Sequence, residues 1–581
     1  MATEQKSSSG NGGGSIDPKS GFCSKTKTFH SLRPKSQLPL QTTPLSLTHY
    51  LLSRLHHSPP QPSTPALLHA TTGHQILYPE FILRVHNLAA SLQSQLGLSH
   101  GQCAFVLSPN SLHLPILHLS LLYLGVIVSP SNPASSNPEI SRQIRLCNPA
   151  VAFATSDTAH KIPNSLRLGT VLLDSSEFES MMLTCPSSTE WHQSSVSQSD
   201  TATILYSSGT TGRVKGVELT HGNWISNLAS SAARNASVPH AVCLCTAPFF
   251  HVYGFAYCLR VLATGDTLVW ITRFDMKAML RSIERFRITH VAWSPPVAVA
   301  LTKFGDGNEM GGYDLSSLQV IACGGAPLAK SVIEKLRKRL PNVQVSQAYG
   351  LTETTARVFA SVGPEETGVE GANGKLMSDL EAKIVDPESG TALPPLMHGE
   401  LWVRGPNIMK GYVGDEAATA AILDPEGWLK TGDICYIDNQ GFLFFVDRLK
   451  ELIKYKGYQV CHLCTSPFNQ TLWFSSSLQW DCLCLHQVAP AELEDLLHSH
   501  PDIVDAAVIP YPDEEAGQVP MAFVVRCLGS AIDESQIKDF IAKQVAPYKK
   551  IRRVTFTKAI PKNAQGKVLR KELIKLALSK L

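Results

Sequence analysis

Residues 206–216 have the sequence Tyr-Ser-Ser-Gly-Thr-Thr-Gly-Arg-Val-Lys-Gly, and the interpretation of the whole chain starts from this stretch. Its glycines allow a backbone to approach a polyphosphate closely, and successive loop N–H groups can form an anion-binding nest. The hydroxyls add neutral donors, and Lys215 adds a positive charge. No Gly-Lys-Ser/Thr ends the stretch, so it is not a Walker loop. Taken alone, it fits a flexible surface loop equally well.

Two further stretches favour a nucleotide site. Ala348–Glu353 (Ala-Tyr-Gly-Leu-Thr-Glu) combines an aromatic face that can stack on a base with a carboxylate that can hold magnesium. Lys430–Asp433 (Lys-Thr-Gly-Asp) offers a carboxylate in a turn, which suits two hydrogen bonds with ribose hydroxyls. Each signal is weak by itself, because an exposed Glu or Asp is usually a solvated surface residue.

The composition excludes several classes of protein. The chain has 581 residues, of which 43% are hydrophobic and 17% charged, with a net charge of +3. This length predicts two or more domains, and the small charge gives no reason to expect a nucleic-acid partner. No segment reaches the roughly 18–20 apolar residues of a membrane helix, so we expect no membrane span. The most apolar run, 115–128, is expected to be a buried helix. The 14 cysteines, without a secretion signal, are expected to be reduced.

Apolar runs alternate with helical patterns from about Ser46 to Asp433. One run is 151–154, and another, 267–271, precedes a helical pattern at 276–283. Such alternation predicts α/β architecture with buried, largely parallel strands.

The pattern changes after Asp433. Residues 434–438 and 442–446 predict a β-hairpin, and Pro490 opens an amphipathic helix. Strands at 504–510 and 521–525 and a helix at 534–546 complete a small α+β domain. The predicted division is a disordered tail at 1–27, a large domain at 28–449 and a small domain at 450–581.

Five motifs stand in one order along the chain: the loop at 206–216, then 349–353, 431–433, 447–451 and 563–567. In this order they resemble the adenylate-forming superfamily of acyl-CoA synthetases, luciferases and peptide-synthetase adenylation domains. Residues 450–459 are similar to the 4-coumarate–CoA ligase-like branch of plants. The resemblance covers nearly the whole chain after the tail. It implies an α/β fold, with a large N-terminal adenylate-forming domain of β-sheets and packed helices and a small, mobile C-terminal α+β domain.

The resemblance also implies roles for individual residues. Contacts with ATP would come from Ser207, Ser208, Gly209, Thr210, Thr211, Gly212, Lys215, Gly325, Ala326, Tyr349, Gly350, Thr352, Asp433 and Arg448. Glu353 would hold Mg²⁺, and Lys450 would be the hinge of the small domain. The acyl pocket would contain Tyr253, Gly324, Ala356 and Arg357. The catalytic set would be His251, near the substrate carboxylate, Lys567, which would act during adenylation, and Lys454 and Gln459, which would face the adenylate in the thioester half-reaction.

These residue types suit an ATP-dependent carboxylic acid–CoA ligase. Attack of a carboxylate on the α-phosphate builds negative charge, which Lys567 and magnesium can stabilise. The resulting acyl-adenylate has a good leaving group for the coenzyme A thiol, so no cysteine is needed as a nucleophile. Rotation about Lys450 would let Lys567 act first and then withdraw. A luciferase-like oxygenase and a catalytically impaired isoform are the alternatives.

The sequence departs from the hydroxycinnamate enzymes directly after Glu353. Those enzymes usually have Ala-Gly-Pro-Val-Leu there, whereas residues 354–359 are Thr-Thr-Ala-Arg-Val-Phe. The departure disfavours 4-coumarate itself, and the candidate substrates are a fatty acid, a jasmonate precursor or a phenylpropanoid-type acid.

A larger departure follows Gln459. The family continues from Gln-Val directly into Ala-Pro-Ala-Glu-Leu-Glu, but here 28 extra residues, 460–487, intervene. They contain no Lys, Arg or Glu, and Val460-Cys461 and Gln487 can be encoded as GTATGT and CAG, which are splice-site sequences. We interpret the insertion as a translated intron that forms a poorly ordered excursion and impairs thioester formation. A zinc site is the alternative, with the ligands Cys461, Cys464, Cys482 and Cys484.

The last three residues, Ser579-Lys580-Leu581, match the peroxisomal address that an import receptor binds at a C-terminus. A chance tripeptide at the end of a helix is the alternative. The sequence therefore predicts a peroxisomal enzyme.

Overall fold

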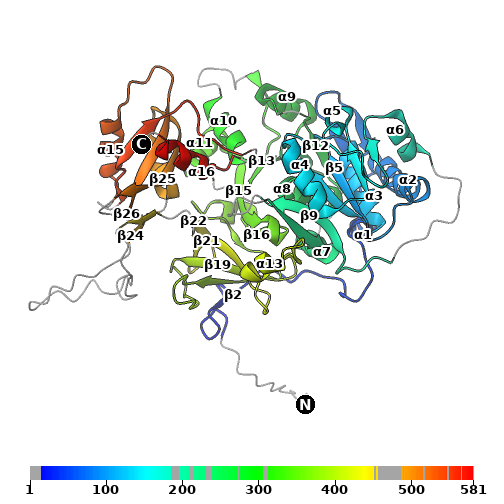
Figure 1. Cartoon of the computed structure of the whole chain (residues 1–581), viewed down its shortest axis with the longest axis horizontal. Coiled ribbons are helices and arrows are strands. Elements are labelled where there is room, and N and C mark those ends of the chain that lie inside the picture. Colours follow the sequence, from blue (N-terminus) through cyan, green and yellow to red (C-terminus); the bar gives the residue numbers. More distant parts are fainter. Residues whose placement is uncertain are drawn as a thin grey trace, which may run out of the picture. The chain divides into compact units, whose positions relative to one another are not determined.

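The computed structural model describes residues 15–184, 195–207, 214–230, 239–272, 274–304, 312–325, 328, 330–449, 453–455, 486–488, 490–513, 517–545, 549–563 and 566–579 (Figure 1). The chain packs as two compact units. Unit 1 contains residues up to 328, 335–431 and 436–444, and unit 2 contains 329–334, 432–435 and 445–581.

Unit 1 contains a sheet whose described strands follow the order β20-β10-β9-β6-β5-β7-β8. The strands are β20 (Gly411–Tyr412), β10 (Lys215–Thr220), β9 (Thr201–Ser207), β6 (Ile127–Ser131), β5 (Cys103–Leu107), β7 (Val151–Ala154) and β8 (Thr170–Leu172). Pairing is parallel from β9 to β8 and antiparallel at β9–β10 and β10–β20. Every residue of β5 and β7 is buried, as expected of parallel strands covered on both faces. The strand predicted at 151–154 is confirmed.

A second sheet follows the order β17-β16-β15-β14-β13-β11-β12-β3-β4. Its strands are β17 (Lys375–Leu376), β16 (Ala356–Ala360), β15 (Gln344–Leu351), β14 (Val320–Cys323), β13 (His290–Trp293), β11 (Val242–Cys245), β12 (Thr267–Trp270), β3 (Pro65–His69) and β4 (Gln75–Leu77). Strands β15 to β3 are parallel. Strand β12 and the following helix α9 (Met276–Phe286) match the pattern predicted after residue 266.

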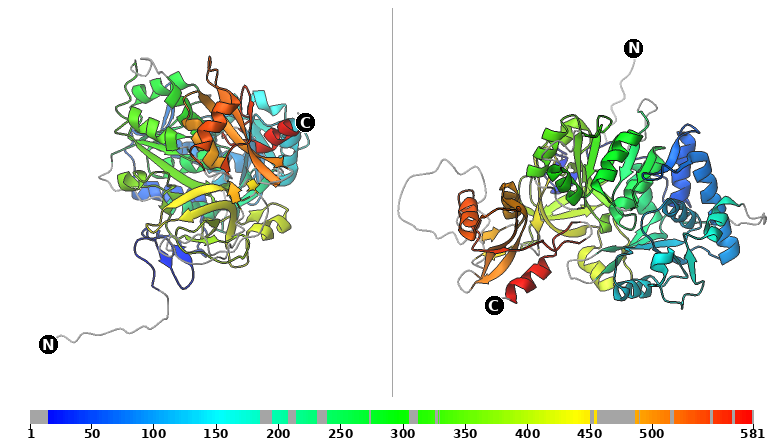
Figure 2. Two further views of the ribbon diagram at one scale, coloured as in Figure 1. Left: turned by 90° about the vertical axis from the view of Figure 1, so that its left-hand side faces the viewer. Right: turned by 90° about the horizontal axis from the view of Figure 1, so that it is seen from above.

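Helices occupy the space between these two sheets (Figure 2). Helix α7 (His221–Ala229) contacts β10, whereas α8 (Val252–Ala263) contacts β11 and β12 and packs on α7. Helix α3 (His113–Tyr123) contacts β6 and is buried on nearly all sides, as a helix between two layers must be. The run at 115–128 is therefore a buried helix only as far as Tyr123, and its last two residues begin β6.

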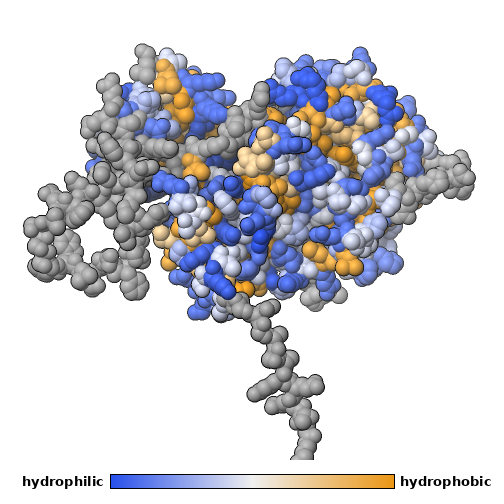
Figure 3. Space-filling view, turned by 60° about the horizontal axis from the view of Figure 1, so that its bottom comes forward, coloured by the Kyte–Doolittle hydropathy of each residue, from blue (hydrophilic) through white to orange (hydrophobic). Residues whose placement is uncertain are grey.

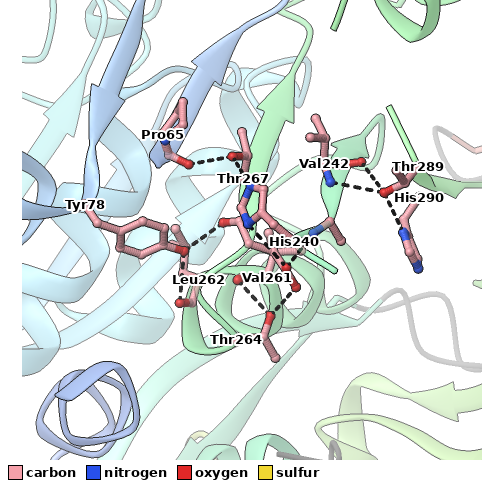
Figure 4. A network of polar contacts seen from close by, with 12 residues as sticks. Pro65, Tyr78, His240, Val242, Val261, Leu262, Thr264, Thr267, Thr289 and His290 are labelled. Atoms are coloured by element: carbon pink, nitrogen blue, oxygen red, sulfur yellow. Dashed lines mark hydrogen bonds and ion pairs between the residues drawn. The ribbon is translucent and has the colours of Figure 1, made fainter. Parts of the chain in front are cut away.

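A network of polar contacts fixes the C-terminal end of α8 (Figure 4). Tyr78, the first residue of α2 (Tyr78–Leu96), donates its hydroxyl to the carbonyls of Leu262 at 3.2 Å and Asp266 at 2.7 Å. The Thr267 hydroxyl donates to the Pro65 carbonyl at 2.7 Å and so joins β12 to β3. The Tyr78 hydroxyl thus anchors the C-terminal end of α8, and the N-terminal end of this helix carries the predicted site residues His251 and Tyr253.

A third sheet follows the order β1-β2-β18-β19-β21-β22. The strands are β1 (Phe22–Cys23), β2 (Thr28–His30), β18 (Glu381–Val385), β19 (Gly399–Arg404), β21 (Leu429–Ile437) and β22 (Leu443–Arg448). The hairpin predicted at 434–446 is confirmed, and Asp438 closes its turn by accepting hydrogen bonds from the amides of Gln440 and Phe442 at 2.9 Å each.

The predicted disordered tail was wrong for residues 15–27. The Asp17 carboxylate accepts a 2.7 Å hydrogen bond from the Ser20 amide and closes a turn. The rings of Phe22 and Phe29 then pack with centroids 4.9 Å apart, and β1 pairs with β2. A side-chain-closed turn and an aromatic pair outweigh the Ser- and Gly-rich composition of this segment. Residues 1–14 lie outside the described part.

Unit 2 is an α+β domain built on the strand order β24-β23-β26-β25, with β27 paired to β26. Its elements are β23 (Ile453–Tyr455), β24 (His486–Val488), α14 (Pro490–Ser499), β25 (Ile503–Asp513), β26 (Gly517–Arg526), α15 (Glu534–Ala542), β27 (Arg553–Phe556) and α16 (Arg570–Leu578). Residues on β25 and β26 contribute to two buried clusters. The helix at 490 and both predicted strands are confirmed. Helix α15 ends at Ala542, before the predicted residue 546.

The predicted excursion at 460–487 was wrong at its C-terminal end. His486 and Gln487 pair with Tyr455 and Lys454 in β24–β23, so a segment predicted to be irregular contains part of a strand. Residues 456–485, including the four candidate zinc ligands, lie outside the described residues.

Within the described ranges, no helix is both long and apolar enough to cross a membrane. The face shown in Figure 3 is largely hydrophilic, with hydrophobic residues in separate patches.

Candidate active site

Four side chains of unit 1 meet where β9 ends and β10 begins. Ser207 ends β9 and Lys215 begins β10, and these two residues are paired across the strands. The Ser207 hydroxyl donates to Glu353 Oε1 at 3.0 Å, and the Tyr412 hydroxyl donates to the same oxygen at 2.9 Å. Lys215 Nζ lies 4.2 Å from the centroid of the Tyr412 ring. The structure thus brings together three predicted residues and one that sequence reasoning missed.

This cluster fits a magnesium–polyphosphate ligand. Magnesium prefers oxygen ligands, and the Ser207 hydroxyl and Glu353 carboxylate supply them, while Lys215 supplies positive charge for phosphate. Among the described residues, both of these hydrogen bonds end on Oε1, so Oε2 would be the oxygen that binds a cation. Burial, and then the Glu353 charge, raise the pKa of Tyr412, which keeps its hydroxyl protonated as a donor. Predicted residues Ser208, Gly209, Thr210, Thr211 and Gly212 lie outside the described ranges.

A turn with a strained backbone follows Glu353. Thr355 and Ala356 have positive φ angles of 49° and 74°, each of which costs on the order of 1–3 kcal/mol for a residue with a Cβ. Asn227 Nδ2 donates to the Thr355 carbonyl at 2.7 Å, and the Thr355 hydroxyl donates to the Asn407 carbonyl at 2.7 Å. These buried contacts hold the strained backbone.

The same turn explains Gly350. A Cβ at this position would lie 1.7 Å from the Ala356 carbonyl oxygen, so only glycine permits the crossing of β15 and β16 here. The neighbouring predicted residues Tyr349 and Thr352 are both buried, and the Tyr349 ring lies 6.5 Å from that of Phe359. The aromatic side chain therefore belongs to a packed wall rather than to a free surface.

The predicted catalytic residue His251 and the predicted acyl-pocket residue Tyr253 lie at the N-terminus of α8, and Gly324 of the predicted acyl pocket lies beside the Tyr253 ring. His251 caps the helix, since its Nδ1 accepts from the Tyr253 amide at 3.3 Å. The Tyr253 hydroxyl donates to the Ala322 carbonyl at 2.8 Å, and a Cβ on Gly324 would lie 3.4 Å from the Tyr253 ring. Burial lowers the pKa of His251 to about 4, so this imidazole is neutral at pH 7. Gly325 follows with a φ of 92°, and Ala326 lies outside the described residues.

Comparison with known proteins identifies the family. The AMP-binding enzyme family matches residues 56–413, and the AMP-binding enzyme C-terminal domain matches residues 492–567. The chain belongs to the AMP-binding, adenylate-forming enzymes. It is 47% identical to 4-coumarate–CoA ligase-like 9 of Arabidopsis thaliana, over 97% of each chain. It is 43% identical to peroxisomal OPC-8:0-CoA ligase 1 of the same plant, over 97% of this chain and 99% of that one.

Solved structures agree with this family. The o-succinylbenzoate CoA synthetase of Bacillus subtilis, in complex with its acyl-adenylate intermediate, is 26% identical with a TM-score of 0.73, covering 90% of this chain and 97% of that one. Its complex with ATP and magnesium ion gives a TM-score of 0.71 at 26% identity, covering 90% of this chain and 99% of that one. The protein is an acid–thiol ligase of the plant 4-coumarate–CoA ligase-like branch that acts through an acyl-adenylate. These relatives give the luciferase-like and impaired-isoform alternatives no support.

In this ligase, the predicted ribose-binding pair lies in unit 2. Arg448 Nε lies 3.5 Å from Asp433 Oδ1, and the Asp433 side chain is buried. The neighbouring Asp447 accepts a 3.0 Å hydrogen bond from the Ala491 amide at the start of α14. Burial raises the pKa of Asp447 to about 6. The motif Asp447-Arg448 therefore combines a structural carboxylate with a paired guanidinium.

Of the other predicted residues of the ligase in unit 2, Lys567 lies in a tight turn. Its amide donates to Asn563 Oδ1 at 2.9 Å, and Gly566 adopts a φ of 83° within the turn. Lys454 is placed only as a backbone position in β23, and Lys450 and Gln459 lie outside the described residues.

Sequence reasoning missed Tyr412, Asn227 and Asn407. Tyr412 is carried by β20, which pairs with β10 next to the loop. The local sequence at 409–412 is Met-Lys-Gly-Tyr, and apart from the lysine it contains no charged residue that would indicate nucleotide binding. The roles of Tyr412, Asn227 and Asn407 depend on contacts with residues that are far away along the chain.

Proposed function

We propose that this ligase activates a fatty acid or a cyclopentanone-type jasmonate precursor in preference to 4-coumarate or another phenylpropanoid-type acid. The observation that carries the proposal is the position of Arg357 on β16, directly after the strained residue Ala356. Strand β16 packs against α8, which carries His251, Tyr253 and Arg260. A guanidinium thus lies beside the predicted acyl pocket, where the hydroxycinnamate pattern has an apolar residue.

The charge of Arg357 favours a substrate with a polar acceptor. Burial, and then repulsion from Arg260 and Arg33, lower the pKa of Arg357 to about 10, so it remains protonated at pH 7. A charged guanidinium donates strong hydrogen bonds to oxygen, and a ring ketone offers such an acceptor. The relative named peroxisomal OPC-8:0-CoA ligase 1 supports this choice of substrate class.

The roles proposed for the other residues follow the two half-reactions. Ser207, the loop at 208–212 and Lys215 would bind the triphosphate, and Glu353 would hold the magnesium that neutralises its charge. Lys567 would stabilise the charge that builds as the substrate carboxylate displaces pyrophosphate. The coenzyme A thiol would then displace AMP, after rotation of the small domain about Lys450.

A panel of acids tests the substrate proposal. We expect kcat/KM for a cyclopentanone-type acid to exceed that for 4-coumarate at least about tenfold, and Arg357→Val to narrow this ratio, because about 1.4 kcal/mol corresponds to a factor of ten. Arg287→Val, which removes an exposed arginine paired with Asp314, is the matched control and should leave the ratio unchanged. A higher kcat/KM for 4-coumarate than for every fatty and cyclopentanone acid would overturn the proposal.

We place this reaction in the peroxisome because of Ser579-Lys580-Leu581. Ser579 is exposed directly after α16, and the last two residues lie outside the described part. A reporter fused upstream of residues 570–581 should enter peroxisomes, and the same reporter without the last three residues should stay in the cytosol. Removal of these three residues from the enzyme itself should leave its catalysis unaltered. Import that persists without the tripeptide would contradict this localisation.

A further inference from the structure

The insertion duplicates a piece of the hairpin that it interrupts. Residues 458–460 are Tyr-Gln-Val and residues 486–488 are His-Gln-Val, and only the second copy runs directly into Ala489 and Pro490. Removing 459–486 or removing 460–487 leaves the same Tyr-Gln-Val-Ala-Pro sequence. From the sequence, Gln459 and Gln487 are therefore equivalent candidates for one position in the fold.

The structure places the second copy in the sheet. Strand β24 pairs with β23 in the register Ile453↔Val488, Lys454↔Gln487 and Tyr455↔His486. Strand β23 is also paired to β26 through Tyr455↔Gly517, so β24 forms the end of the sheet in unit 2. Gln487 thus stands opposite Lys454, which the resemblance assigns to the same half-reaction as Gln459.

Packing at α14 explains why the second copy is selected. Val488 is fully buried in the same core cluster as Leu493 and Leu497 of α14. With Pro490 as the first helical residue, Val488 precedes the N-cap and Leu493 is the fourth helical residue, which are the two positions of a hydrophobic staple. A single residue joins Val488 to the helix, so ordering α14 also orders β24.

The entropy of the long connection does not favour either copy. With Val488 in the strand, residues 456–485 connect Tyr455 to His486. With Val460 there, the connection is 461–489, which is almost as long. Closure cost grows only with the logarithm of length, so the two arrangements differ by less than about 0.1 kcal/mol. The staple at α14 is then the term that distinguishes them.

We infer that His486-Gln487-Val488 is the working second strand of this hairpin, and that Gln487, not Gln459, serves the thioester half-reaction. This inference rests on the proposed ligase function. The insertion lengthens the connection within the hairpin, but its last residue, Gln487, forms a second Gln-Val pair with Val488. The thioester activity that remains in the full chain therefore depends on Gln487.

Half-reaction assays test this assignment in the full chain. Gln487→Ala should lower acyl-CoA formation from preformed acyl-adenylate about tenfold, the size of a lost hydrogen bond to a charged group, and should leave pyrophosphate exchange nearly unchanged. Gln459→Ala is the matched control and should alter neither rate. In a chain lacking 460–487, Gln459 directly precedes Val488, and there Gln459→Ala should cause the loss that it does not cause in the full chain.

A cross-link tests the strand pairing independently of activity. Paired Cα atoms of antiparallel strands lie about 4.5–5.5 Å apart, within reach of a disulfide. Lys454→Cys combined with Gln487→Cys should form one under oxidation, identified by peptide mapping, and Lys454→Cys combined with Gln459→Cys should not.

The outcomes separate this inference from the proposed function. The assignment of Gln487 would be overturned if Gln459→Ala lowered thioester formation, if both variants lowered it equally, or if neither did. It would also be overturned if the full chain catalysed adenylation but no thioester formation. Absence of pyrophosphate exchange with every acid tested would instead refute the ligase function.

Discussion

The Tyr412 hydroxyl lies 2.9 Å from Glu353 Oε1, although 59 positions separate the two residues in the chain. Ser207 reaches the same oxygen from 146 positions away. Strand β20 brings the tyrosine to this place by pairing with β10. The carboxylate proposed to hold magnesium is therefore oriented by two hydroxyls from separate strands, and Lys215 lies over the ring of one of them.

Tyr412→Phe should weaken the binding of magnesium–ATP without unfolding the protein. It removes one hydrogen bond to a charged group, which contributes roughly 1.5–3 kcal/mol, so we expect KM for magnesium–ATP to rise by at least about tenfold. Steady-state kinetics at varied magnesium concentration measure this. Tyr436→Phe is the control, since that ring stacks on Phe444 with centroids 4.7 Å apart. Unchanged magnesium dependence in the Tyr412 variant would show that this contact does not orient the ligand.

Lys567→Ala should nearly abolish adenylate formation and largely spare acyl-CoA formation from preformed adenylate. The reason is that charge builds on the α-phosphate only in the first half-reaction. Lys562→Ala, which removes a lysine paired with Asp505 at 2.7 Å in the same unit, should leave both half-reactions largely intact. Equal losses in the two half-reactions for Lys567→Ala would argue against the proposed rotation of the small domain.

The stability of the protein should fall between pH 7 and pH 5, in part because of His118. This side chain is buried in α3, its ring centroid 5.1 Å from that of Phe255, and burial lowers its pKa to about 3. The unfolded state, with a pKa near 6.5, binds more protons in this range, so stability present above pH 6.5 is lost as the pH falls toward 3.

His118→Leu should reduce the loss of unfolding free energy between pH 7 and pH 5 by about 2 kcal/mol. Urea unfolding at the two pH values measures it, with His56→Leu, at an exposed position, as the control. An identical pH dependence in the His118 variant and the original chain would mean that this imidazole becomes protonated in the folded state.

Deletion of residues 460–487 should raise the rate of acyl-CoA formation, because it restores the short connection within the hairpin. We interpret the segment as a translated intron, so complementary DNA across the junction should include transcripts without these codons. If every transcript retains them and the deletion lowers activity, the segment is a functional module, and zinc binding by its four cysteines becomes the hypothesis to test by metal analysis.

Much of the fold followed from local patterns. The apolar strand at 151–154, the helix that begins at Pro490 and the hairpin at 434–446 were predictable, because hydrophobic periodicity and turn residues act over a few neighbouring positions. The order of five motifs was sufficient to indicate the family. Residues 15–27 were predicted wrongly, because their order depends on the contact of Phe22 with Phe29 and on pairing with a strand that follows the turn.

The sequence by itself determined the α/β class, the adenylate-forming family and the identity of Ser207, Lys215 and Glu353 as site candidates, since these depend on residue type and local spacing. Only the tertiary structure decided that Tyr412 completes the cluster and that Asn227 supports the strained turn, because both contacts join residues that are remote along the chain. It also decided between two identical Gln-Val copies. Sequence cannot distinguish them, whereas burial of Val488 beneath α14 does, because only one valine can occupy that place in the core.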